Sequence, residues 1–131
     1  MKDSKVLKAF LIFSGLLLTF IGGATLFMPV AIKASSGVDL AGNVSVLNDI
    51  RASAALILGL AILIISGAFV RKITYTSSLI SFLVFLSLGI GRILSILSDG
   101  MPVDPIVKAT GLEMVLGVLG LVLFMRNREK N

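Results

Sequence analysis

Residues 47–70 have the sequence LNDIRASAALILGLAILIISGAFV, and this stretch decides the fold class. From Ala52 to Val70 it carries no charged side chain. A helix that spans a bilayer needs about 20 predominantly apolar residues. Three further runs meet this requirement: residues 7–32, 73–98 and 105–125. Because water is absent from the bilayer core, each run must satisfy its own backbone groups, which predicts four helices.

The composition of the whole chain agrees with a membrane protein. Of its 131 residues, 56% are hydrophobic and 15% are charged, and the mean hydropathy is +1.06. A soluble domain of this length could not cover so much apolar surface with so few charges, which excludes a cytosolic globular enzyme. We therefore expect an all-α membrane protein: an antiparallel bundle of four transmembrane helices that forms a single transmembrane domain over residues 1–131.

The residue types that are missing exclude several kinds of chemistry. The chain contains no cysteine and no histidine. Disulfides, thiolate nucleophiles, Cys/His zinc sites, haem-ligating histidines and histidine-based triads are therefore impossible within it. We predict no catalytic residue, no metal and no cofactor. The net charge of +5 sits at the ends of apolar runs, so we expect no nucleic-acid partner.

The distribution of Lys and Arg predicts the orientation in the membrane. The loop at residues 33–46, which forms a small hairpin or a lid in this interpretation, has only Lys33, and the other loop on its side has only Lys108. The opposite side carries eight basic residues: Lys2, Lys5, Lys8, Arg71, Lys72, Arg126, Arg128 and Lys130. Both termini are therefore predicted to face the cytoplasm.

Each predicted helix carries one seam of small or polar residues at intervals of three and four. Residues at this spacing share one face of a helix, and small residues let membrane helices approach closely. We expect these seams to face the other helices in a compact bundle. They contain Gly15, Thr19 and Gly22 in the first helix, Arg51, Ala55 and Gly59 in the second, Ser78, Ser81 and Arg92 in the third, and Thr110, Glu113 and Gly117 in the fourth.

A few charged residues lie deep within the predicted spans. At about 1.5 Å per residue, Arg92 lies about 9 Å and Glu113 about 12 Å inside the outer ends of their helices. An isolated charge deep in lipid costs on the order of 3 kcal/mol on insertion scales, so these groups should face inward and pair. We predict a pair of Arg92 with Glu113, and a second contact of Arg51 with Asp99 or Glu113.

These residues define a candidate polar cluster in an outward-opening pocket beneath the loop at residues 33–46. Its members are Asn48, Arg51, Arg92, Asp99 and Glu113. Structural roles remain open alternatives for some of them. A buried Arg–Glu pair can serve packing specificity alone, Asn48 can cap a helix N-terminus, and Asp99 can simply terminate its helix.

The order of these motifs resembles a known family. Asn48-Asp49-Ile50-Arg51-Ala52, Gly91-Arg92, Ser98-Asp99-Gly100 and Glu113 are similar to the pattern of small four-helix bacterial membrane proteins known as domain of unknown function 4345. The resemblance covers nearly the whole chain, and it implies that the Arg, Asp and Glu residues of the cluster belong to a shared motif. It also implies a multi-pass protein of the bacterial cytoplasmic (inner) membrane. The chain departs from the family at Ala54-Ala55, where an aromatic-Gly pair is frequent.

Three functions are compatible with the sequence. The first is a non-enzymatic protein that binds membrane lipids or another small amphiphile, or that acts as an accessory in a homo-oligomer or larger membrane complex. The second is an intramembrane enzyme on a lipid-like substrate, with Asp99 and Glu113 as acid and base. The third is a small proton-coupled transporter, although the first span carries no charge beyond Lys8. The sequence favours the first, a protein that is not an enzyme.

Overall fold

The computed structural model describes residues 1–129 and contains no strand in that range. Four long helices are present, each long and apolar enough to cross a membrane, as the sequence predicts. A short helix and a single 3-10 turn lie between them. The elements are α1 (Lys5–Phe27), α2 (Pro29–Ala34), α3 (Val44–Phe69), η1 (Arg71–Ile73), α4 (Thr74–Asp99) and α5 (Asp104–Asn127).

The first span differs from the single helix predicted over residues 7–32. The helix ends at Phe27, and Met28 has a non-helical backbone with φ −133° and ψ 57°. Pro29 then begins the short helix α2. Proline lacks an N–H group, clashes with the carbonyl four residues earlier and disfavours the helical conformation in the residue before it. Pro29 therefore turns the chain away from α1 instead of falling within its last turn.

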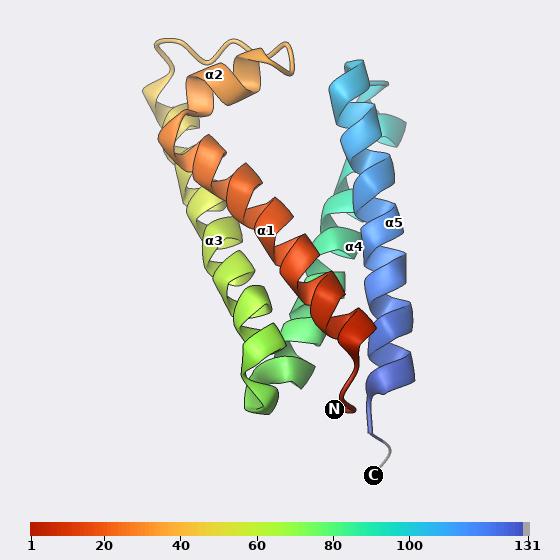
Figure 1. Cartoon of the computed structure of the whole chain (residues 1–131). Helices are drawn as coiled ribbons and strands as arrows, with labels where there is room; N and C mark the ends of the chain where they lie inside the picture. Colours follow the sequence, from red (N-terminus) through yellow and green to blue (C-terminus); the bar gives the residue numbers. More distant parts are fainter. Residues whose placement is uncertain (130–131) are drawn as a thin grey trace.

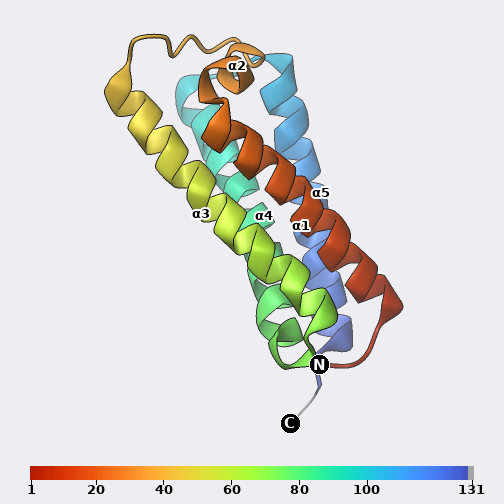
Figure 2. The ribbon, with the colours of Figure 1, turned by 60° about the vertical axis from the view of Figure 1, so that its left-hand side comes forward.

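The long helices are arranged as two pairs (Figures 1 and 2). The first pair is α1 with α3 and the second is α4 with α5, and the pairs meet mainly through α3 and α4. The N-terminus and the end of α5 lie at one end of the bundle, which we call the terminal end. At the opposite end, which carries α2 and which we call the α2 end, the two pairs diverge (Figure 1).

Close packing within the first pair depends on glycines of α1. A Cβ atom added to Gly15 would collide with the Ile65 side chain of α3, and one added to Gly22 would lie 3.0 Å from the Ala54 carbonyl oxygen. The glycine seam predicted for α1 therefore faces a helix. The seam predicted for α3 is wrong, because Ala55 and Gly59 are exposed. The contacting face of α3 is a different face with small residues, because Ala54 and Ala61 are buried and their carbonyl groups lie close to the glycines of α1.

The core extends from the middle of the helices to the terminal end. Leu11, Ile64 and Phe85 are at most 1% exposed, and they belong to a single apolar cluster with residues of all four long helices. The hydroxyl groups of Ser14 on α1 and Ser81 on α4 lie 3.3 Å apart within hydrogen-bonding distance, and both side chains are fully buried. In a membrane, such small hydroxyl residues allow helices to approach closely.

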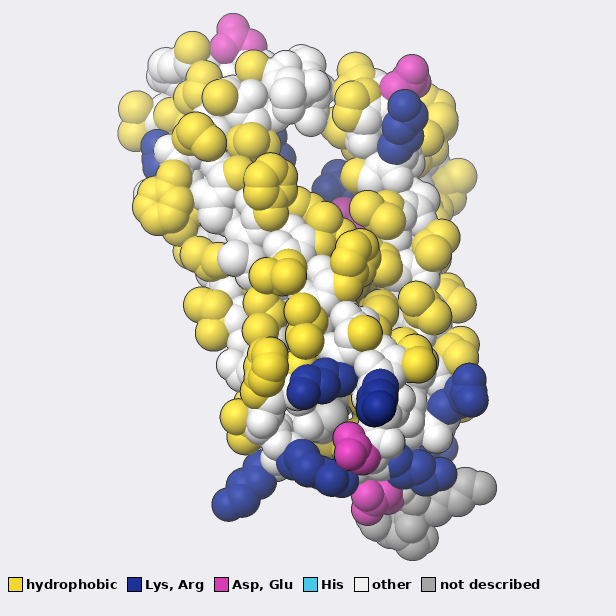
Figure 3. All heavy atoms as spheres, viewed as in Figure 1, with side chains coloured by type: hydrophobic (Ala, Val, Ile, Leu, Met, Phe, Trp, Pro, Cys, Tyr) yellow, Lys and Arg dark blue, Asp and Glu magenta, His cyan; other side chains and the backbone are white. Residues whose placement is uncertain are grey.

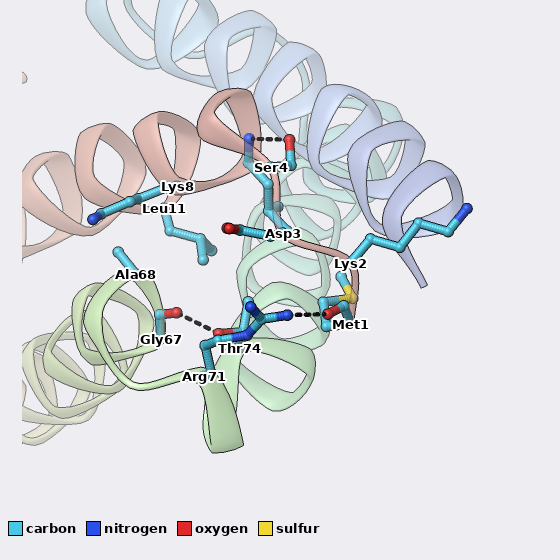
Figure 4. Close-up of a pocket in the computed structure, with 11 residues that line it drawn as sticks. Met1, Lys2, Asp3, Ser4, Lys8, Leu11, Gly67, Ala68, Arg71 and Thr74 are labelled. Carbon is cyan, nitrogen blue, oxygen red and sulfur yellow. Dashed lines mark hydrogen bonds between the residues drawn. The ribbon is translucent and has the colours of Figure 1, made fainter. Parts of the chain in front are cut away.

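The connection between α3 and α4 completes this closed end. Thr74 Oγ1 donates to the Gly67 carbonyl at 2.7 Å, and Arg71 Nη2 donates to the Met1 carbonyl at 3.5 Å (Figure 4). Ser77 Oγ donates to the Leu63 carbonyl at 2.7 Å. These bonds satisfy polar groups where the chain turns, and they tie the N-terminal segment to the turn.

The α2 end is covered only by α2 and the loop that follows it. Asn43 caps α3, since its side chain accepts a hydrogen bond from Val46 N–H at 3.1 Å. The loop forms turns and no hairpin of strands. It buries Leu40, and Gly37 lies close to the Val103 side chain beside the start of α5. This loop therefore reaches from the first helix pair toward the second.

Candidate functional site

A cleft lies between the two helix pairs at the α2 end. It comprises a mouth of about 310 Å³, lined by residues of α1, α2, α3 and α4, and a deeper chamber of about 80 Å³ that reaches α5. Ile21, Ile57 and Arg92 line both parts, so the two adjoin each other. Figure 3 shows the hollow between the pairs, with Lys or Arg and Asp or Glu side chains inside it.

Arg92 and Glu113 form the ion pair that the sequence predicts. Arg92 Nε donates to Glu113 Oε2 at 2.8 Å. The Glu113 side chain is 13% exposed and the Arg92 side chain 38%, so the carboxylate is largely enclosed while part of the guanidinium faces the cleft. The bond is charge-assisted, and the remaining guanidinium N–H groups leave donors for a further acceptor.

The local packing of α4 on α5 sets the register of this pair. A Cβ atom on Gly89 would collide with the Met114 side chain, and one on Gly117 would lie 2.9 Å from the Leu86 backbone nitrogen. The two helices are therefore in close contact one turn on the terminal side of the pair. Arg92 follows Gly89 by three residues and Glu113 precedes Gly117 by four, so both lie on the contacting faces.

Four polar side chains at the mouth were not predicted as site residues. They are Thr25 of α1, Lys33 of α2, and Asp49 and Ser53 of α3. The sequence does contain a signal for the last two, because Asp49, Ser53 and Ile57 follow one another at intervals of four on one face of a helix. Lys33 carries no such signal, since only the break at Pro29 directs α2 toward the cleft.

Arg51 makes a different contact from the predicted one. Its guanidinium donates to the Leu26 carbonyl in the last turn of α1, and neither Asp99 nor Glu113 is its partner among the described residues. The helix break before Pro29 leaves the last carbonyls of α1 without intrahelical donors, and a cation is favourable at a helix C-terminus. Arg51 therefore caps α1 and joins it to α3.

Asn48 and Asp99 also lie outside the lining of the cleft. Asn48 is exposed on α3 behind the cap formed by Asn43. Asp99 is exposed at the end of α4, where it accepts a hydrogen bond from Ser95 Oγ at 3.4 Å. Of the predicted cluster, the structure brings together only Arg92 and Glu113. The remaining members share the same end of the bundle but not the same site.

Four helices that are long and apolar enough to span a membrane, arranged around a polar cleft, are the architecture of a multi-pass membrane protein. The chain belongs to the family described as Domain of unknown function (DUF4345), whose model matches residues 6–124. This confirms the family suggested by the sequence motifs. Searches of the curated proteins and of the solved structures found no match. The geometry of the cleft is therefore the basis for proposing a function.

Proposed function

We propose that this protein binds a membrane amphiphile in the cleft between its two helix pairs. In the same proposal the chain is an antiparallel bundle in the bacterial cytoplasmic membrane, with both termini in the cytoplasm and the cleft opening outward. The gathering of Lys and Arg side chains at the terminal end supports this orientation (Figure 3). Lys130, which contributes to the predicted charge bias, lies outside the described residues.

The observation that carries the proposal is the change of polarity along the cleft. Charged and hydroxyl side chains line its mouth, including Lys33, Asp49 and Ser53. Below the Arg92–Glu113 pair, the chamber is lined by apolar residues such as Leu18 and Phe85. A ligand site of this kind, apolar with a few convergent polar groups, suits a molecule with a charged head and a hydrocarbon body.

The depth of the polar groups supports the same conclusion. Counting from the end of α4, Arg92 lies about 10 Å inside the helix. This depth is below the phospholipid headgroups and within the hydrocarbon core. A charge at this depth is costly unless it faces protein or water. The cleft provides that environment, and it lets an amphiphile exchange its head between the membrane surface and the cleft.

Native mass spectrometry of the purified protein tests this function. Wild-type protein released from gentle detergent is expected to retain amphiphile. Ser53→Phe, which fills the mouth of the cleft, should lose most of it. Ala52→Phe is the matched control, because Ala52 is also exposed, lies about 100° from Ser53 around the axis of α3 and lines no part of the cleft. Retention that is absent in the wild type, or equal in both variants, would contradict the proposal.

The structure gives less support to the enzyme alternative. That hypothesis relies on Asp99 and Glu113 as a pair of titrating carboxylates in one site. Glu113 lies at the chamber and accepts a hydrogen bond from Arg92, whereas Asp99 is exposed and lines neither part of the cleft.

A protein partner in place of a lipid would appear in the same mass spectra as a stoichiometric complex of higher mass.

A further inference from the structure

We propose that the amphiphile is a phospholipid whose head carries both a phosphate and a primary ammonium, with one acyl chain in a groove between α3 and α4. This inference rests on the proposed function and specifies its ligand. Two independent observations support it. One is the balance of charges in the cleft, and the other is an apolar groove on the membrane-facing surface that adjoins the chamber.

The cleft is lined by two cations and two carboxylates. Arg92 and Glu113 already neutralise each other through their 2.8 Å contact. Lys33 and Asp49 line the mouth, and neither forms an ion pair within residues 1–129. A headgroup with only a negative charge would satisfy Lys33 but would face Asp49 with a like charge. A zwitterionic head satisfies both, with its phosphate toward Lys33 and Arg92 and its ammonium toward Asp49.

The lining of the mouth also favours a primary over a quaternary ammonium. Carboxylate oxygens accept hydrogen bonds, which a primary ammonium donates and a quaternary one cannot. Quaternary ammonium groups are typically recognised by aromatic side chains. The only aromatic residue lining the described cleft is Phe85 in the deeper chamber, and none lines the mouth beside Asp49.

The groove lies between α3 and α4 and has a volume of about 400 Å³. Its lining is almost entirely aliphatic and includes Leu56, Leu60 and Leu83. Ile57 and Leu88 line both the groove and the deeper chamber, so they form the boundary between the two. The groove and the chamber therefore adjoin at these two side chains, and in this proposal the acyl chain crosses there from the cleft to the groove.

The dimensions of the groove suit an acyl chain. It extends along α4 to Ile80, twelve residues from Arg92, which corresponds to about 18 Å of helix. The hydrocarbon core of a bilayer is about 30 Å thick. A chain that starts at the level of Arg92 and follows α4 therefore covers the groove and ends beyond the middle of the membrane. Because the groove adjoins the cleft, the proposal assigns the acyl chain and the head to one ligand.

Lipid titration of delipidated protein in detergent tests both parts of the inference. The probes are phosphatidylethanolamine, phosphatidylcholine and phosphatidylglycerol with identical chains, and binding is measured by native mass spectrometry. We expect phosphatidylethanolamine to bind at least tenfold more tightly than the other two. Asp49→Asn should reduce this preference to within about twofold. Asp99→Asn, which removes an exposed carboxylate outside the cleft, should leave it unchanged.

The position of the acyl chain in the groove is tested with a second pair of variants, both on α4. Leu83→Trp should weaken binding of long-chain phosphatidylethanolamine about tenfold and leave binding of a six-carbon-chain analogue unchanged. Leu94→Trp is the control, since this leucine is also exposed but lines neither cleft nor groove. Soluble glycerophosphoethanolamine, which has the head without chains, should not compete at millimolar concentration.

The outcomes separate this inference from the proposed function. Equal or tighter binding of phosphatidylglycerol, with Ser53→Phe still abolishing it, overturns the headgroup assignment and leaves amphiphile binding intact. Unchanged binding in Leu83→Trp overturns the placement of the chain. No lipid bound to wild-type protein contradicts both proposals. Preference for phosphatidylethanolamine that depends on Asp49 and Leu83 supports the inference as stated.

Discussion

The two ends of the bundle solve the same packing problem differently. At the terminal end, apolar side chains from all four long helices and a buried pair of serine hydroxyls hold the two helix pairs together. At the α2 end, the pairs separate around Arg92 and Glu113, and the space between them is open. The polar residues inside the bundle therefore differ between its ends: small hydroxyls alone lie where the pairs touch, and charged side chains join hydroxyls where the pairs part.

The helices themselves do not explain this difference, because each is apolar along most of its length. What differs is the size of the side chains at the contacts. Gly67 packs directly on Ser77 at the terminal end, where no larger residue fits. At the α2 end, the faces that line the space between the pairs carry Asp49, Ser53 and Arg92, which need polar surroundings. Four sets of substitutions test the comparison.

The largest effect on stability is expected at the contact between Gly67 and Ser77 at the terminal end. Gly67→Leu would drive a side chain into Ser77, and overpacking of this kind costs about 3 kcal/mol. Unfolding in a mixed-detergent titration, followed by circular dichroism, measures the loss. Gly59→Leu is the control on the same helix, because nothing lies within 4 Å of a Cβ atom there. Equal destabilisation by both variants would show that the terminal end is not tightly packed.

The charged pair at the open end should give the next largest effect. Glu113→Leu leaves Arg92 without its partner at depth, and we expect a loss of about 2 kcal/mol in the free energy of unfolding. The double variant Arg92→Leu/Glu113→Leu should be more stable than Glu113→Leu, since no unpaired charge remains. A double variant that is as unstable as the sum of the two single variants would show that the two residues do not interact.

A smaller effect on stability is expected from the hydrogen bonds that hydroxyl groups donate at the terminal end. Ser77→Ala removes the 2.7 Å bond to the Leu63 carbonyl, and interhelical hydrogen bonds in membrane proteins average about 0.6 kcal/mol. Ser87→Ala, at an exposed position on the same helix, should have no measurable effect. The same detergent titration compares the two. A larger loss of stability in Ser87→Ala than in Ser77→Ala would show that the Ser77 bond does not stabilise the terminal end.

The smallest effect concerns the cap that holds α1 to α3 at the open end. Arg51→Ala removes the donor to the Leu26 carbonyl, and a cation at an exposed helix C-terminus contributes about 0.5 kcal/mol. Asn48→Ala, one turn earlier and exposed, should change stability by less than this. If Arg51→Ala instead abolished amphiphile retention without affecting stability, Arg51 would belong to the binding site as the sequence first suggested.

The sequence predicted the spans and the Arg92–Glu113 pair because both follow from strong constraints. Backbone groups in lipid must form helices, and deep charges must find partners. The seam predicted for α3 was wrong because this helix carries small residues on more than one face. Ala54, Ala61 and Gly67 are buried against other helices, whereas Ala55 and Gly59 are exposed.

The composition of the cleft depended on tertiary features that periodicity does not encode. The break at Pro29 brings Lys33 to the mouth, and it also leaves the Leu26 carbonyl available to Arg51. The predicted contact of Arg51 with an acidic residue ignored this backbone acceptor. The alternative role of Asn48 as a helix cap is wrong, because Asn43 takes that role five residues earlier. One helix break therefore accounts for most of the differences at the site.

The most direct test of the open cleft uses the absence of cysteine from the chain. Single variants Ser53→Cys and Ala52→Cys place thiols about 100° apart around α3, both exposed and about 12–14 Å from its start, and only Ser53 lines the cleft. In lipid vesicles, a charged, membrane-impermeant maleimide should label Ser53→Cys and leave Ala52→Cys unlabelled, and bound amphiphile should slow the first reaction. Labelling of Ala52→Cys alone, or of neither thiol, would contradict an accessible cleft between the two helix pairs.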